Sequence, residues 1–108
     1  MTEGLDSSRQ RTSLFFFRLN PPRADFAQTM TPDEQQAMAE HMEYWQQLLD
    51  DGRVVVYGPV ADPEGVWGLG VLRAADRAEV LAIGELDPSV LAGVNTFDVF
   101  EIIGGRTG

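Results

Sequence analysis

The sequence contains neither cysteine nor lysine, and these two absences exclude several kinds of site. Without cysteine the chain has no disulfide bonds, thiolate metal ligands or cysteine nucleophiles. All eight basic residues are arginine, so no lysine amine can form a Schiff base or hold phosphate in a P-loop. Any catalytic chemistry must come from other side chains.

Positive charge and long apolar runs are also scarce. Eight basic residues stand against 17 acidic ones, and the net charge of −9 repels phosphate backbones. No stretch approaches the roughly 20 apolar residues of a membrane span. Residues 1–11 lack the apolar segment of a secretory signal peptide. We therefore expect no nucleic-acid partner, no membrane partner and a cytoplasmic location.

The length of 108 residues fits one domain, which at this size buries roughly 60–70% of its unfolded surface. Residues 1–12 show no periodicity and few large apolar side chains, so we expect a disordered tail there. A single α+β domain is expected over residues 13–104.

Hydrophobic periodicity predicts four strands and two helices. The strands are expected at residues 14–19, 53–57, 66–72 and 96–103. Thr31-Pro32-Asp33-Glu34 predicts a capping box, from which a helix of about five turns runs to Asp51-Gly52. A shorter helix begins at Asp76 and stops before Asp87-Pro88. Loops are expected at residues 20–30 and 61–65, and a turn at Ser89–Gly93.

The predicted order is βαββαβ, the ferredoxin-like arrangement in which two helices cover one face of a four-stranded antiparallel sheet. Strand residues alternate between the two faces, so the apolar ones cannot all lie beneath the helices. These residues are Phe15, Phe17, Val55, Tyr57, Phe97, Phe100 and Ile102. An apolar open face predicts a homodimer formed through that face of the sheet.

Two glycines interrupt the third predicted strand on the same face. Trp67, Leu69 and Val71 alternate with Gly68 and Gly70, so one face of this strand lacks side chains. That face can admit a ligand, or it can be covered closely by a helix. The sequence supports the second interpretation at least as well as the first.

Several residues in fixed order resemble the YCII-related family over about residues 14–103. These are His41, Leu48, Gly52, Gly58-Pro59, Asp87-Pro88 and Ala92-Gly93. The resemblance implies a dimeric α/β barrel with an active site in each subunit that contains the histidine and the aspartate. Family members with a known reaction act on small organic molecules, for example by dehydrochlorination of a chlorinated hydroxyhydroquinone. The tail and the two loops depart from the short family form, which leaves the substrate open.

His41, the only histidine, falls with Met38, Met42 and Trp45 on the apolar side of the first helix. A histidine moves protons near neutral pH, and a neighbouring carboxylate such as Asp87 can orient its ring. The alternative is a core histidine bonded to a backbone carbonyl. An aspartate before proline also commonly initiates a turn through its own backbone.

Proton transfer by this pair would need neither a metal nor a cofactor, and none is expected. Donors for a developing oxyanion would complete the site. The candidate substrate-binding residues are Arg18 (or Arg53), Tyr57, Gly58 and Gly68. We assign Trp45 and Trp67 to packing or to pocket walls. The acidic residues of the first predicted helix are spread along it and indicate a face exposed to solvent rather than a metal site.

Two main functions remain open from sequence. The first is a cofactor-independent lyase or isomerase that acts on a small organic metabolite by His41/Asp87 acid-base catalysis. The second is a non-catalytic module that binds a small molecule or serves as an accessory subunit. A barrel that handles oxygen without a cofactor is a third alternative, because one architecture can host many chemistries.

Overall fold

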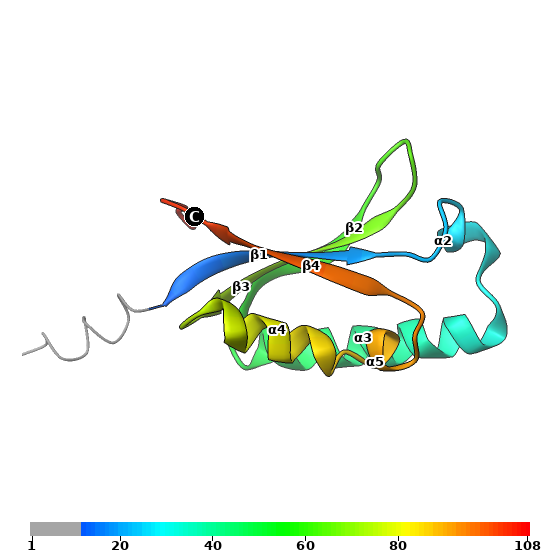
Figure 1. Ribbon diagram of the computed structural model, residues 1–108, viewed down its shortest axis with the longest axis horizontal. Helices are drawn as coiled ribbons and strands as arrows, with labels where there is room; N and C mark the ends of the chain where they lie inside the picture. The colour runs from blue at the N-terminus through cyan, green and yellow to red at the C-terminus, as the bar shows by residue number, and fades with distance from the viewer. Residues whose placement is uncertain (1–11) are drawn as a thin grey trace, which may run out of the picture.

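The computed structural model describes residues 12–108 and contains a four-stranded antiparallel sheet covered by helices on one face (Figure 1). The expected tail at residues 1–12 lies, apart from Thr12, outside the described residues. The elements are β1 (Ser13–Asn20), α2 (Phe26–Thr29), α3 (Pro32–Asp50), β2 (Val54–Val60), β3 (Trp67–Ala74), α4 (Arg77–Glu85), α5 (Pro88–Leu91) and β4 (Thr96–Ile102). The predicted ferredoxin-like α+β fold is confirmed.

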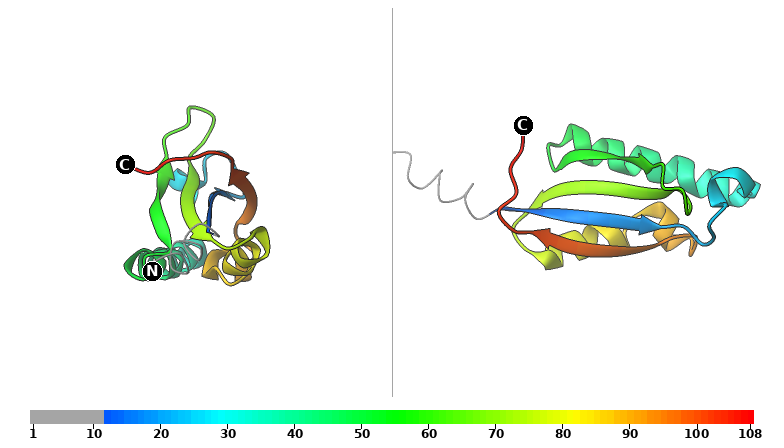
Figure 2. Two further views of the ribbon diagram at one scale, coloured as in Figure 1. Left: turned by 90° about the vertical axis from the view of Figure 1, so that its left-hand side faces the viewer. Right: turned by 90° about the horizontal axis from the view of Figure 1, so that it is seen from above.

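The strands lie in the order β2-β3-β1-β4, with β1 paired to both β3 and β4. Figure 2 shows the four strands side by side, with the long helix α3 and the pair α4–α5 beneath them. The opposite face carries no helix among the described residues. Its apolar side chains include Phe16 and the half-exposed Phe100 and Val56.

Helix α3 begins and ends as the sequence predicts. The Thr31 hydroxyl accepts a hydrogen bond from the Glu34 backbone N–H, and the Glu34 carboxylate accepts one from the Thr31 backbone N–H. This reciprocal pair is the capping box. Gly52 follows the helix with a φ of 80°, which a glycine adopts without the steric cost of a Cβ atom.

Three local predictions were wrong in detail. Strand β2 does not end before Gly58-Pro59 but continues through it, because β2 is an edge strand where a proline needs no ladder partner. The predicted loop at 20–30 contains the single turn of α2. The predicted turn at Ser89–Gly93 overlaps α5, which Pro88 begins and Asp87 caps.

The core lies between the sheet and the helices. Its large buried members are Phe15, Phe17, Leu19, Trp45, Leu48, Val54, Leu72, Val80, Ile83 and Val99. The ring of Trp45 lies directly over Gly70, where an added Cβ atom would come within 2.6 Å of the ring. A closely packed helix is therefore the correct interpretation of Gly70.

Candidate active site

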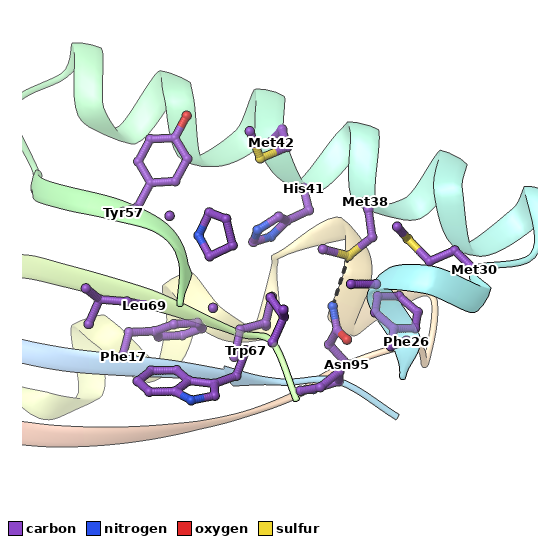
Figure 3. Close-up of a pocket in the computed structure, with 17 residues that line it drawn as sticks. Phe17, Phe26, Met30, Met38, His41, Met42, Tyr57, Trp67, Leu69 and Asn95 are labelled. Carbon is purple, nitrogen blue, oxygen red and sulfur yellow. Dashed lines mark hydrogen bonds between the residues drawn. The ribbon is translucent and has the colours of Figure 1, made fainter. Parts of the chain in front are cut away.

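An apolar cavity of about 270 Å³ lies between α3, α2 and the ends of β2 and β3 (Figure 3). Its walls come from six parts of the chain and contain no acidic residue, lysine or arginine. They are formed by Phe17, Leu19, Pro21, Phe26, Ala27, Met30, Met38, His41, Met42, Tyr57, Gly58, Pro59, Val66, Trp67, Gly68, Leu69 and Asn95. Concave, mostly apolar sites with a few polar groups are typical of small-molecule binding.

His41 lies on the buried face of α3, and its ring points into this cavity (Figure 3). Its Nδ1 atom is 2.7 Å from Oδ2 of Asp87. A carboxylate only accepts hydrogen bonds, so Nδ1 carries the proton and donates it to this bond. No hydrogen bond of the described residues involves Nε2, which leaves this atom available to a molecule in the cavity.

Asp87 has no exposed surface and lies at the junction between α4 and α5. Its Oδ1 atom accepts hydrogen bonds of 2.8 Å from the backbone N–H and the hydroxyl of Ser89, which caps α5. Its Oδ2 atom accepts from His41 and, also at 2.7 Å, from the Trp45 indole N–H. Burial raises the pKa of Asp87, but these hydrogen bonds and the charge of His41 outweigh burial and hold it below its ordinary value.

Sequence reasoning brought His41 and Asp87 together but missed the other two partners of the carboxylate. Trp45 follows His41 by four residues, a spacing that places both on one face of α3, so the helical period could have indicated its role. Ser89 lies two residues after Asp87, the ordinary position for a capped backbone N–H. Asp87 therefore does both things that the sequence suggested: it bonds the backbone of its own turn and it pairs with His41.

Three of the predicted substrate-binding residues, Tyr57, Gly58 and Gly68, line the cavity with His41. The Tyr57 hydroxyl is already engaged, because it donates a 2.8 Å hydrogen bond to Oε1 of Gln46. Gly68 faces Leu19, and an added Cβ atom there would lie 3.0 Å from the Leu19 side chain.

The two candidate arginines lie outside the cavity. Arg18 is exposed on the open sheet face, where its guanidinium carbon lies 4.4 Å from the centre of the Trp67 ring. Strand alternation explains this position, because its neighbours Phe17 and Leu19 point to the helices. Arg53 forms an ion pair of 2.8 Å with Glu79 at the other end of the sheet.

Asn95, which sequence reasoning missed, also lines the cavity and is only 3% exposed. Its amide nitrogen donates to the Met38 sulfur at 3.2 Å, and its amide oxygen has no partner. No periodic or motif signal in the sequence distinguishes this residue.

Within residues 12–108, no three histidine, aspartate or glutamate side chains gather as a metal site. In the same part of the chain, no helix is both long and apolar enough to cross a membrane.

Comparison with known proteins gives one family and several similar structures. The chain is similar to 5-chloro-2-hydroxyhydroquinone dehydrochlorinase from Burkholderia phenoliruptrix AC1100 in complex with 2,5-dihydroxybenzoquinone. The identity is 20% and the TM-score 0.60, over 84% of this chain and 95% of that chain. No curated protein matches the chain.

Two further solved structures are similar at 14% identity. A protein of unknown function from Nitrosomonas europaea has a TM-score of 0.48, over 91% of this chain and 96% of that chain. A cofactor-independent oxygenase from Streptomyces nogalater has a TM-score of 0.44, over 89% of this chain and 95% of that chain. Since the model of the YCII-related domain matches residues 14–103, as the sequence motifs predicted, the chain belongs to the YCII-related domain family.

Proposed function

We propose that this protein is a cofactor-independent enzyme of the lyase or isomerase type, in which His41 transfers a proton to or from a small organic metabolite. The observation that supports the proposal is the buried His41–Asp87 pair in the wall of an apolar cavity. Nε2 of His41 is the group that reaches the substrate. Tyr57, Gly58 and Gly68 form part of the substrate-binding wall, whereas Arg18 does not line the cavity.

In the proposed reaction the lone pair of Nε2 takes a proton from a C–H or O–H group of the substrate. In an elimination, the electrons of that bond form a double bond and expel a leaving group from the neighbouring position. In an isomerisation, the imidazolium returns the proton to another atom of the same molecule. Asp87 acts as a positioning residue, because it fixes Nδ1 as the protonated nitrogen and stabilises the imidazolium.

The apolar walls contribute to this chemistry through solvent exclusion. A cavity with few polar groups strengthens the electrostatic interaction between His41 and a developing charge. The walls contain no arginine or lysine that could bind a carboxylate or phosphate, which favours a neutral molecule.

The dehydrochlorinase named above supplies a defined probe substrate. We would incubate the protein with 5-chloro-2-hydroxyhydroquinone and measure the release of chloride. His41→Gln should lower the rate by roughly 100-fold or more, the usual contribution of general acid-base catalysis. Glu40→Gln, on the exposed side of the same helix, is the matched control and should retain full activity. Equal turnover by wild type and His41→Gln would refute the role of His41.

A second measurement needs no turnover. Because the chain has one histidine, diethyl pyrocarbonate should modify one imidazole per chain, and 5-chloro-2-hydroxyhydroquinone should slow the modification. Protection by this molecule without release of chloride would favour the non-catalytic binding module.

A further inference from the structure

The Asn95 side chain is the most poorly satisfied polar group of the cavity. Its oxygen is the one buried side-chain nitrogen or oxygen atom of the described residues that has no hydrogen-bond partner. Its nitrogen has only the Met38 sulfur, and a thioether is a weak acceptor. Native structures leave few buried polar atoms unpaired, and each of them needs an explanation.

The turn that carries Asn95 does not depend on this amide. The turn before β4 is held by the main chain, since the backbone N–H groups of Val94 and Asn95 both donate to the Ser89 carbonyl, at 3.0 and 3.1 Å. The side chain instead projects to the cavity, on the side opposite α3 (Figure 3). An apolar residue of similar size would satisfy the packing without an unpaired acceptor.

The chemistry of the two neighbours determines which amide atom is free. An N–H group toward the Met38 sulfur is attractive, whereas a carbonyl oxygen there would face sulfur lone pairs. The unpaired atom is therefore the acceptor, Oδ1, which requires a donor. The terminal torsion of asparagine is soft and the Met38 side chain is flexible, so Oδ1 can meet a ligand without backbone movement.

We propose that Asn95 is a ligand-binding residue, whose amide oxygen accepts a hydrogen bond from a hydroxyl of a small, neutral, largely apolar substrate. This inference rests on the proposed function, because the ligand occupies the cavity that His41 lines. The substrate would then carry a hydroxyl group that binds Asn95. The lack of arginine, lysine and acidic residues in the walls accounts for the neutral body of the molecule.

The test compares two probes that differ in one donor, 4-ethylphenol and its methyl ether, 4-ethylanisole. Binding is measured by titration calorimetry and by NMR shifts of cavity residues. Wild type should bind the phenol roughly fivefold to tenfold more tightly than the ether, the contribution of one hydrogen bond. Asn95→Leu should bind both probes equally, while Met38→Leu should retain the preference for the phenol.

The outcomes separate this inference from the proposed function. His41→Gln should keep the preference for the phenol, because binding needs no proton transfer. Equal affinity of wild type for both probes, or no binding of either, would overturn the role of Asn95 and leave His41 chemistry open. A melting temperature of Asn95→Leu several degrees below that of wild type would assign the amide to the fold and overturn the proposal. If Asn95→Leu does not fold, Asn95→Ala takes its place, because it removes the same acceptor without adding volume and leaves Nε2 of His41 unchanged.

Discussion

At the residue scale, the two carboxylate oxygens of Asp87 bind different parts of the fold. One oxygen caps α5 through Ser89, and the other holds His41 and Trp45. A buried carboxylate is tolerated only where hydrogen bonds and an opposite charge compensate its desolvation. The candidate site is therefore also a joint between α3 and the α4–α5 segment.

The pH dependence of stability should reveal this pairing. The folded-state pKa of Asp87 lies below the ordinary 3.8, so its contribution is complete above about pH 4 and is lost as the pH falls through the folded pKa. Asp87→Asn should lower the free energy of unfolding by about 3–5 kcal/mol at pH 7. Urea unfolding at several pH values should show a flatter acid profile for the variant. Parallel profiles for the two proteins would contradict a charged, paired Asp87.

At the element scale, the contact of α3 with β3 depends on one glycine. Gly70 leaves room for the Trp45 ring, and the same ring donates to Asp87. The contact between Trp45 and Gly70 thus sets the distance between α3, which carries His41, and the sheet. Gly58 on the neighbouring strand has no atom within 4 Å of its missing Cβ and makes no such contact.

These two glycines form a matched pair for mutation. Gly70→Ala should destabilise the fold by about 1–3 kcal/mol, because the new methyl group forces Trp45 to move. Gly58→Ala should change stability by no more than about 0.5 kcal/mol. Chemical denaturation of both variants measures the difference. Equal losses would show that Trp45 does not rest on Gly70.

The segment before α3 is anchored by an ion pair between Arg23 and Glu34. The guanidinium makes two bonds to the carboxylate, at 2.7 and 2.9 Å, beside the capping box. The Arg23 hydrogen bonds, with the Thr31 backbone N–H, lower the pKa of Glu34 to about 2. This anchor holds α2, which forms part of the cavity wall through Phe26.

Removal of the guanidinium should therefore move the titration of Glu34. In Arg23→Gln the pKa of Glu34 should rise from about 2 toward its ordinary 4.5. The stabilisation by this carboxylate is complete above pH 4.5 and is lost as the pH falls toward 2. NMR of the side-chain carboxyl carbons measures the change. An unchanged pKa would assign the shift to the capping box alone.

Sequence patterns could predict most of the fold and part of the candidate site, for reasons visible in particular residues. Helical spacing placed His41 on the buried face of α3, and capping residues located both long helices. Periodicity indicates which face of a strand or helix is buried, but not how the helix is positioned over the sheet. It therefore could not decide whether Trp45 or a ligand covers Gly70. Asn95 enters the cavity through tertiary packing alone and carries no local signal.

At the scale of the whole molecule, the uncovered sheet face is the remaining surface to explain. The Phe16 ring stacks on the Phe100 ring, with 5.8 Å between the ring centroids. It also makes a T-shaped contact with the Trp67 ring, with 6.1 Å between the centroids. Phe100 is 53% exposed and Val56 47%. Contiguous apolar side chains on one face favour a second copy of the chain as the partner, the assembly that the sequence predicted.

A charge in this face should prevent the association. Phe100→Arg should shift the protein from dimer to monomer in sedimentation equilibrium, because the guanidinium would be buried without a partner. Leu91→Arg, at a 67% exposed position on α5, is the matched control and should leave the mass unchanged. A monomeric wild type, or a dimeric Phe100→Arg, would exclude the sheet face as the interface.

The place of β1 in the middle of the sheet has a consequence for synthesis on the ribosome. β1 is made first, yet one of its two neighbours, β4, covers residues 96–102 and is made last. Until then one edge of β1 has no strand beside it, and unpaired edges expose a nascent chain to wrong pairings. The hydrogen bond of His41 also forms late, since its partner Asp87 follows 46 residues later in the chain. The sheet and the site are therefore completed together, near the end of translation of this domain.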